Sequence, residues 1–441
     1  MIDFLILTNL LILFSVYLLY FLLLKNKRAP RLFIFYLLSF TLFIESHFIL
    51  SFFSSFQFAF SEWFFVGDFS EDVKISMILA VSLYLLGLIW GEVTVAFTGK
   101  IKGEVKWQSF YSHDISKLAF YLVLLISPFV IKYVVTLIRF ISDNGFYSLY
   151  ENGEKISGGY ILDLFFLLLY ILLICSNHKK KISLLIIVFA LVYLLIGTRL
   201  EFIFKLFPVI VYYFLGVKNI SLIFNRKNLF FAFFAFSIFI FGMQYSVSLR
   251  DNIDLGDNVF FTFLKQQGVS INVLGIAIKD ENNNLLNNFV IFSPIYDSIK
   301  ALCNIILGNF QSNGNSVEFA MNSLSLSHKL SLIEDREAYL SGYGVGGNSL
   351  AELYLLGGTF FCFIGGALTY YIITFLEKIA IKSRYLLLFA MVAFGKIIYS
   401  PRGEYFSFLS IDRTFLLILL LSFSFYMMTL TSVSPICKRV K

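Results

Sequence analysis

Long apolar runs, separated by short polar segments, make up most of the chain. Several runs reach about 18 residues with few charged side chains, which is the length of helix that crosses about 30 Å of hydrocarbon. Inside lipid a helix satisfies its own backbone hydrogen bonds, so each run predicts a helical span. The predicted spans cover residues 2–24, 32–53, 73–95, 118–141, 159–176, 182–197, 202–217, 228–246, 350–375, 385–399 and 411–431.

This pattern predicts an all-α, polytopic integral membrane protein with about 11 transmembrane helices. One long hydrophilic interruption divides the chain. Residues 1–246 hold spans one to eight, residues 247–349 form a large loop, and residues 350–441 hold spans nine to eleven. The N-terminal segment has no basic flank and no small-residue cleavage site, so we expect the first span to remain in the protein.

The large loop contains one segment with the pattern of an amphipathic helix. Ser293 and Pro294 match a helix cap followed by proline at the first helical position, and Gly308 would end the helix. The apolar positions between them are Ile295, Ile299, Leu302 and Ile306. Their spacing places them on one helix face, which could lie along the membrane surface.

Composition and charge support the membrane assignment. With 59% hydrophobic residues, 14% charged residues and 55 Phe in 441 positions, the chain cannot bury its apolar surface as a water-soluble protein. The net charge of +7 is concentrated in short basic clusters between spans rather than in a nucleic-acid-binding surface. The four cysteines have no paired spacing, which argues against a disulfide framework and a cysteine metal site.

The basic clusters also predict the orientation. They lie in alternate connections, which are therefore cytoplasmic: Lys25 to Arg31, Lys100 to Lys106, Lys179 to Lys181, Lys218 to Lys227, Lys378 to Arg384 and Lys438 to Lys441. An odd number of spans then places the N-terminus outside and the C-terminus inside. The large loop is external, and its excess of acidic residues argues against nucleic-acid binding.

Three arginines break this charge rule, because Arg199, Arg250 and Arg402 lie on outer connections. A charge at membrane depth costs about 2.5–3.5 kcal/mol on insertion scales, so it usually has a partner or a function. Each arginine could reach the headgroups or pair with the acid beside it. These acids are Glu201, Asp251 and Glu404 respectively. Alternatively, the three guanidinium groups could bind a pyrophosphate, since a guanidinium suits phosphate oxygens.

Two further polar residues, Glu45 and His47, fall inside the second predicted span. They could line a polar cavity or pair with Lys132 or Arg139 of the fourth span.

Several features together resemble the bacterial O-antigen polymerases, the oligosaccharide repeat unit polymerases of the Wzy type. Ile196-Gly197-Thr198-Arg199 is similar to the Gly-Thr-Arg turn of that family. The segment from Gly342 to Gly358 resembles its glycine-rich stretch leading into a Glu-Leu-Tyr helix. The Arg402 turn before the final span and the large loop between spans eight and nine complete the resemblance.

The resemblance implies an inner-membrane glycosyltransferase of the GT-C type. Such an enzyme joins undecaprenyl pyrophosphate-linked oligosaccharides at the periplasmic face. With the orientation predicted from the basic clusters, the N-terminus is then periplasmic and the C-terminus cytoplasmic. Its implied partners are those lipid-linked oligosaccharides and membrane lipid, with a polysaccharide chain-length regulator as a further candidate. The related O-antigen ligases carry a loop histidine before a glycine-rich turn, but Lys329 follows His328 here and Gly342 lies farther away.

This reaction needs charge stabilisation and proton removal, because the pyrophosphate is already a good leaving group. The candidates for the base are His328, Glu352 and Glu404. Structural roles compete with catalysis: a solvated loop position for His328, a favourable helix N-terminus for Glu352 and an ion pair with Arg402 for Glu404.

Two more residues are candidates for substrate contact. Arg336 could contact sugar or phosphate or belong to a solvated salt-bridge run, and Tyr343 could stack on sugar or belong to the interfacial aromatic belt. The sequence contains no Asp-x-Asp pair, no phosphate-binding Gly-x-x-x-x-Gly-Lys loop and no His-x-x-x-His, so we expect no cofactor and no metal. The series Asp251, Asp254 and Asp257 is a solvated turn or, alternatively, a cation site.

Other functions remain open from sequence alone. A flippase or another transporter would be expected to have related halves with matched helix breaks, and neither is present. An O-antigen ligase or a polysaccharide acyltransferase is a further alternative, and for the latter only His47 lies deep in a span.

Overall fold

In the computed structural model of the chain, the described residues are 1–53, 69–98, 112–144, 159–195, 199–216, 237, 240–242, 244, 259–286, 289–306 and 315–410. Every regular element among them is helical. Six of these helices are long and apolar enough to cross a membrane. The chain is therefore a multi-pass membrane protein. The total of eleven spans stays a prediction, because residues 411–431 and most of 228–246 lie outside the described residues.

The first three long helical segments match predicted spans. Helix α1 covers Ile2–Lys25 and α4 covers Glu71–Phe97. The second span is divided into α2 (Phe33–Phe40), a π-helical turn η1 (Thr41–Glu45) and α3 (Ser46–Phe53). A π-helical turn is rare and widens the helix locally, which changes the directions of the side chains that follow.

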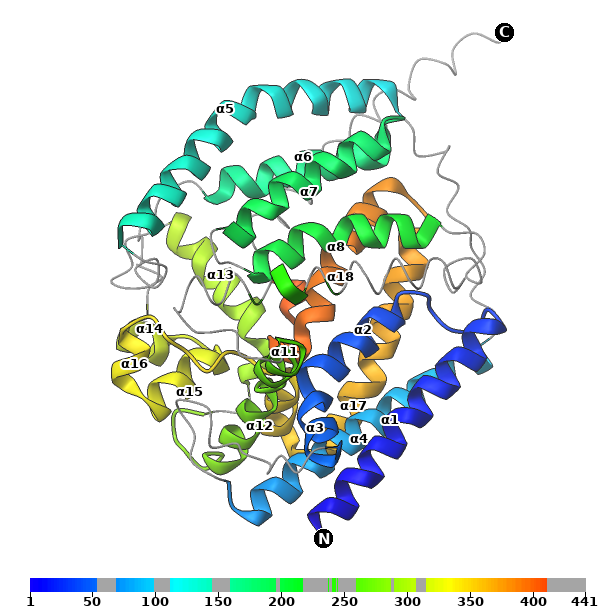
Figure 1. Cartoon of the computed structure of the whole chain (residues 1–441), viewed down its shortest axis with the longest axis vertical. Coiled ribbons are helices and arrows are strands. Elements are labelled where there is room, and N and C mark those ends of the chain that lie inside the picture. The colour runs from blue at the N-terminus through cyan, green and yellow to red at the C-terminus, as the bar shows by residue number, and fades with distance from the viewer. Residues whose placement is uncertain are drawn as a thin grey trace, which may run out of the picture.

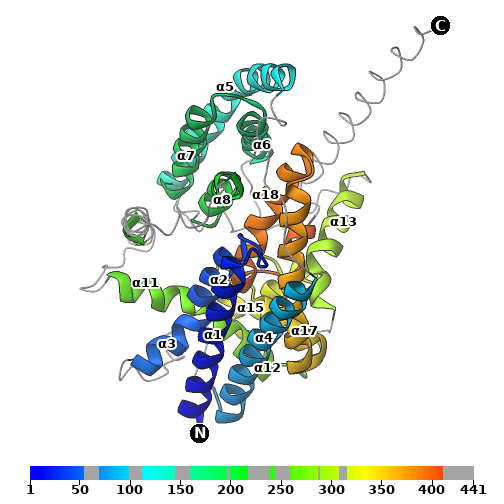
Figure 2. The same cartoon turned by 90° about the vertical axis from the view of Figure 1, so that its right-hand side faces the viewer.

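Four helices form a second group at the top of Figures 1 and 2. These are α5 (His113–Asn144), α6 (Gly159–Cys175), α7 (Lys179–Leu195) and α8 (Arg199–Gly216). The two groups are joined where α8 packs on α18 (Arg384–Tyr399). The predicted outer turn between α7 and α8 and the one that follows α18 are therefore attached to helices that pack on each other.

The lower group is built on very close packing of α4 against α17 (Ser349–Ala380). A Cβ atom added to Gly87 would lie 2.0 Å from the carbonyl oxygen of Phe363, and one added to Gly366 would lie 2.1 Å from that of Tyr84. In lipid, small residues allow helix backbones to approach in this way, and dispersion contacts then hold the helices together.

Helix α17 consists of two arms that meet at Gly357 and Gly358, where the backbone leaves the helical conformation. Gly358 has φ +69°, which favours glycine. Leu353 packs against the Cα of Gly365, although residues 12 apart in a straight helix would be separated by about 18 Å. The first arm therefore folds back on the second, an interruption that the apolar pattern of 350–375 does not predict.

The large loop folds into short helices that extend from the left side of Figure 1 to its centre. They are α11 (Val259–Gly268), α12 (Ser270–Lys279), η5 (Val290–Phe292), α13 (Ser293–Ile306), α14 (Val317–Asn322), α15 (Leu326–Glu334) and α16 (Arg336–Leu340). Helix α13 begins at Ser293, where the sequence pattern places the start of an amphipathic helix, and the predicted end at Gly308 lies outside the described residues.

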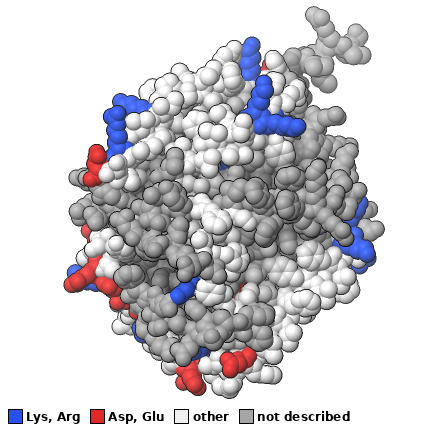
Figure 3. Space-filling model, in the orientation of Figure 1, with Lys and Arg blue, Asp and Glu red and all other residues white. Residues whose placement is uncertain are grey.

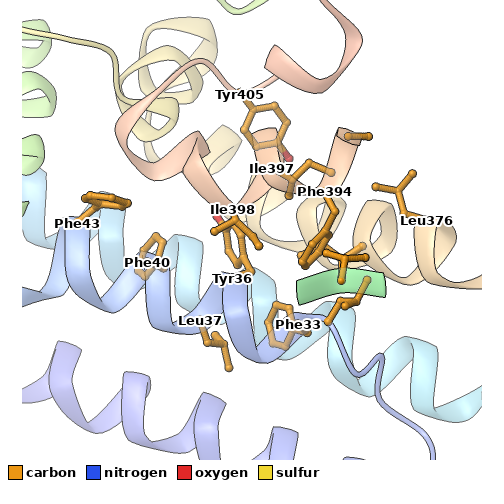
Figure 4. Close-up of a cluster of buried hydrophobic side chains, with 14 of the residues drawn as sticks. Phe33, Tyr36, Leu37, Phe40, Phe43, Leu376, Phe394, Ile397, Ile398 and Tyr405 are labelled. Carbon is orange, nitrogen blue, oxygen red and sulfur yellow. The ribbon is translucent and has the colours of Figure 1, made fainter. Parts of the chain in front are cut away.

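Aromatic and aliphatic side chains fill the space between the second span and α18. Figure 4 shows Phe33, Tyr36, Phe40 and Phe43 along the second span facing Phe394, Ile397 and Ile398 of α18, with Tyr405 beyond them. This core supports the turn that follows α18, residues 400–410. The sequence predicts that this turn is external, and we call it the outer turn; two of the candidate residues, Arg402 and Glu404, lie in it.

Candidate functional site

The outer turn after α18 is held firmly against the rest of the protein. Pro401 lies in a short 3₁₀ turn, η6 (Ser400–Arg402), and a second one, η7, covers Ser407–Leu409. A Cβ atom added to Gly347 would lie 3.2 Å from the carbonyl carbon of Gly403, so the two backbones run close together. The turn is thereby packed against the glycine-rich segment that precedes α17.

Arg402 is half-buried and contacts two neutral groups. Its Nη1 donates a hydrogen bond of 2.6 Å to Oε1 of Gln267 in α11, and its guanidinium carbon lies 5.7 Å from the centroid of the Phe43 ring in η1. The ion pair with Glu404 that the sequence suggested as an alternative is wrong: within the described part of the chain, Glu404 has other partners and forms no ion pair with Arg402.

The Glu404 carboxyl group points toward the large loop. Its Oε1 accepts hydrogen bonds from the hydroxyl groups of Ser293, at 2.9 Å, and Ser325, at 3.1 Å. Burial raises the pKa of Glu404, while the two hydroxyl groups lower it, Asp297 raises it and Lys396 lowers it. The hydroxyl of Ser293, expected to cap α13, thus binds Glu404.

Glu352 lies in the first arm of α17 and is fully buried. The side chain of Asn348 caps this arm by accepting hydrogen bonds from the backbone N–H groups of Leu350 and Ala351. Oε2 of Glu352 accepts a hydrogen bond of 2.8 Å from the backbone N–H of Tyr405, and Oε1 has no hydrogen-bond partner among the described residues. The Glu352 and Glu404 carboxyl groups are close enough to interact electrostatically.

Tyr405 connects the outer turn to both arms of α17. Its backbone binds Glu352 in the first arm, and its hydroxyl donates a hydrogen bond of 2.7 Å to the carbonyl oxygen of Gly365 in the second. The hydroxyl also lies 3.1 Å from that of Thr369, which lies 2.8 Å from that of Tyr84. A chain of buried hydroxyl groups therefore fixes the turn to α17 and α4.

Arg199 is the first residue of α8, and its side chain is not among the described ones. Helices α8 and α18 are antiparallel, because Phe204 contacts Tyr399 with ring centroids 5.5 Å apart and Phe207 lies beside Gly395. Arg199 comes before Phe204 in α8, and Arg402 comes after Tyr399 of the antiparallel α18. Because Phe204 and Tyr399 are in contact, the two arginines belong to the same end of this helix pair. Arg250 lies outside the described residues.

The other candidate residues chosen from the sequence lie elsewhere in the large loop: His328, Arg336 and Tyr343. The His328 ring packs edge-on against Phe319 and Tyr339, and Nδ1 lies 3.0 Å from the Tyr339 hydroxyl. Arg336 is exposed at the start of α16, and Tyr343 is exposed after it. The structure thus brings Arg402, Glu404 and Glu352 together and leaves these three residues outside that cluster.

The polar residues of the second span have partners different from those proposed. Glu45 accepts a hydrogen bond of 2.7 Å from Asn9 of α1, rather than pairing with Lys132 or Arg139. His47 Nε2 lies 3.2 Å from the backbone oxygen of Lys265.

Sequence reasoning missed four groups that surround this cluster: Gln267, Phe43, Ser325 and Tyr405. Such residues are common in membrane proteins, and their contacts depend on the π-helical turn and on the fold of the loop. No group of three or more His, Cys, Asp or Glu residues that could hold a metal is found in the described ranges, and Asp251, Asp254 and Asp257 fall outside them.

In a comparison with protein-family models, residues 2–431 match the family described as O-antigen polysaccharide polymerase Wzy. The chain belongs to this family. The O-antigen polymerase resemblance seen in the sequence is thereby confirmed, and the protein is a glycosyltransferase-type polymerase of O-antigen repeat units. The polymerase family acts on lipid-linked oligosaccharide repeat units. Comparisons of this polymerase with curated proteins and with solved structures find no match.

Proposed function

We propose that this polymerase binds the pyrophosphate of an undecaprenyl-linked donor with Arg402 and uses Glu404 as the base. One observation carries the proposal: the guanidinium of Arg402 is held by the amide oxygen of Gln267 and the ring of Phe43, not by a carboxylate. Its positive charge is therefore not neutralised by these contacts. A guanidinium has five N–H donors in a fixed plane, so donors beyond the one bound to Gln267 suit phosphate oxygens.

Arg199 is proposed as a second residue that binds the donor's pyrophosphate. The support is its place at the first residue of α8, at the same end of the α8–α18 pair as Arg402. Arg250 is proposed as a third such residue from its position in the sequence alone. Two or three guanidinium groups would stabilise the negative charge that develops as the lipid pyrophosphate departs.

The proposed reaction is a glycosyl transfer between two lipid-linked molecules. The acceptor hydroxyl oxygen attacks the anomeric carbon of the donor's reducing-end sugar. The bond between that carbon and the pyrophosphate oxygen breaks, and undecaprenyl pyrophosphate leaves with the bonding electrons. The acceptor proton passes to the Glu404 carboxylate, as in general-base catalysis.

Glu404 is preferred as the base over the other two candidates. Its burial raises its pKa, which makes its carboxylate a stronger base than an exposed one. Glu352 binds the backbone of Tyr405, so its proposed role is to hold the turn. His328 packs against Phe319 and Tyr339, and we propose that it supports the loop. Exposed Arg336 and Tyr343 are proposed sugar contacts.

We propose that the site faces the periplasm of a bacterial inner membrane in a GT-C-type fold, with the N-terminus periplasmic and the C-terminus cytoplasmic. In Figure 3 the visible Asp and Glu side chains lie along the left and lower edges, the side of the large-loop helices in Figure 1. Lys and Arg side chains are most prominent at the upper and right edges, and a few lie at the left edge and in the lower centre. The prominent basic groups at the upper and right edges support a cytoplasmic side there by the positive-inside rule. A chain-length regulator is a proposed further partner.

The experiment is a gel of lipopolysaccharide from a deletion strain that carries wild-type or variant protein. Arg402→Ala is expected to leave a single repeat unit on the lipid core, whereas the exposed Arg28→Ala on the cytoplasmic side should restore the full ladder. Loss of a ligase would leave no repeat unit on the core, and loss of a flippase would trap units inside. A normal ladder from Arg402→Ala, with equal protein in the membrane, would contradict the proposal.

A further inference from the structure

Gln267 is placed against Arg402 by several contacts of its own. It is 6% exposed, and its backbone oxygen accepts a hydrogen bond of 3.2 Å from the Ser270 hydroxyl. The next residue, Gly268, presses on the second span: an added Cβ would lie 2.3 Å from both Ser46 Oγ and His47 Cδ2. The end of α11 therefore has little freedom to move, and the amide of Gln267 is held in place.

The guanidinium of Arg402 is fixed from two directions. Gln267 accepts from Nη1, and Phe43 lies against the guanidinium group. Phe43 itself packs edge-on against Tyr399, with ring centroids 5.5 Å apart, at the end of α18. Because Phe43 belongs to the π-helical turn Thr41–Glu45, that turn contributes directly to the geometry around Arg402.

We propose that Gln267 is a positioning residue that orients Arg402 for the donor's diphosphate while leaving the arginine charge uncompensated. This inference rests on the proposed function. A glutamate at position 267 would have the same shape and would bind the guanidinium more strongly, but it would compete with the diphosphate for the same cation. The neutral amide oxygen orients the guanidinium group of Arg402 without competing with the diphosphate.

The test uses the full-length protein in nanodiscs with lipid-linked repeat units, and measures kcat and the KM for the donor. Gln267→Glu is expected to raise the donor KM about tenfold or more, with thermal stability unchanged or higher. Gln267→Ala, which removes the acceptor without adding charge, is expected to lower kcat/KM about tenfold. A purely structural role for Gln267 predicts instead that Gln267→Glu behaves like wild type.

Gln266→Glu is the matched control, since Gln266 lies beside Gln267 in α11 but accepts a hydrogen bond of 3.3 Å from Gln244. It adds the same charge to the same helix end and should leave the donor KM within about twofold, because charges that are not in contact are screened by salt. A donor KM near the wild-type value in Gln267→Glu, or a normal kcat/KM in Gln267→Ala, would overturn the inference.

Arg402→Ala separates this inference from the proposed function. If Arg402→Ala is inactive while both Gln267 variants are normal, the positioning role fails and the role of Arg402 stands. If Arg402→Ala is itself active, the proposed function fails.

Discussion

Arg402 and Glu404 are separated by a single glycine, yet their side chains bind different partners. The guanidinium donates to Gln267 of α11, and the carboxyl group accepts from Ser293 and Ser325 of the large loop. Both side chains therefore belong to the same turn, but they form no ion pair with each other. The proposed roles of Arg402 in phosphate binding and of Glu404 in proton removal need this separation, because an ion pair would weaken both.

Glu404→Gln is expected to abolish polymerisation while stabilising the protein at neutral pH. Burial raises the folded-state pKa of Glu404, so its contribution to stability is present below the ordinary glutamate pKa and is lost as pH rises through the raised value. The neutral amide of the Glu404→Gln variant does not titrate, so the variant does not lose this stability as pH rises. Melting curves over a pH series should show that the melting temperature of the variant increases relative to that of wild type as pH rises. A stability difference that is constant with pH would contradict the assignment.

Replacing the two serines that bind Glu404 should change the pH dependence of activity. The hydroxyl groups of Ser293 and Ser325 lower the pKa of Glu404, so the double variant Ser293→Ala, Ser325→Ala should raise it further. The acidic limb of the pH–rate profile then shifts to higher pH, with activity on that limb reduced roughly tenfold. Ser298→Ala is the control, because its hydroxyl binds a backbone oxygen within α13. An unshifted acidic limb in the double variant would exclude Glu404 as the base.

The break in α17 should depend on glycine at position 358. Gly358 has φ +69° and ψ −159°, so Gly358→Ala is expected to cost about 1–3 kcal/mol of backbone strain. Relief of that strain would straighten the helix and move Glu352 away from Tyr405, which lowers both melting temperature and activity. Gly395→Ala has room, since the added Cβ would lie 3.6 Å from Phe207, and should behave like wild type. Normal activity of Gly358→Ala would show that the break is dispensable.

Much of the fold could be predicted because lipid imposes a simple rule. Runs long enough to cross hydrocarbon must be helical, and the ranges 2–24 and 73–95 therefore anticipate α1 and α4. The amphipathic pattern after Ser293 likewise anticipates α13. The break at Gly357 and Gly358 escaped this reasoning, since two arms folded against each other have the same apolar composition as one continuous span.

The candidate site was predictable only in part. Arg402 stood out because a positive charge on an outer connection is unusual, and Glu404 stood out beside it. Their partners could not be inferred, since Gln267 lies 135 residues away in the chain and Phe43 is one of 55 phenylalanines. Sequence proximity favoured an ion pair between Arg402 and Glu404, but the loop serines and the α11 amide offer contacts that only the tertiary fold brings into reach.

Binding of undecaprenyl pyrophosphate to the purified protein in nanodiscs tests the central claim most directly. Arg402→Ala is expected to raise the Kd for this lipid by about 10- to 100-fold, the loss typical of charge-assisted hydrogen bonds, while Arg28→Ala leaves the Kd unchanged. An equal Kd for wild type and Arg402→Ala would contradict the account.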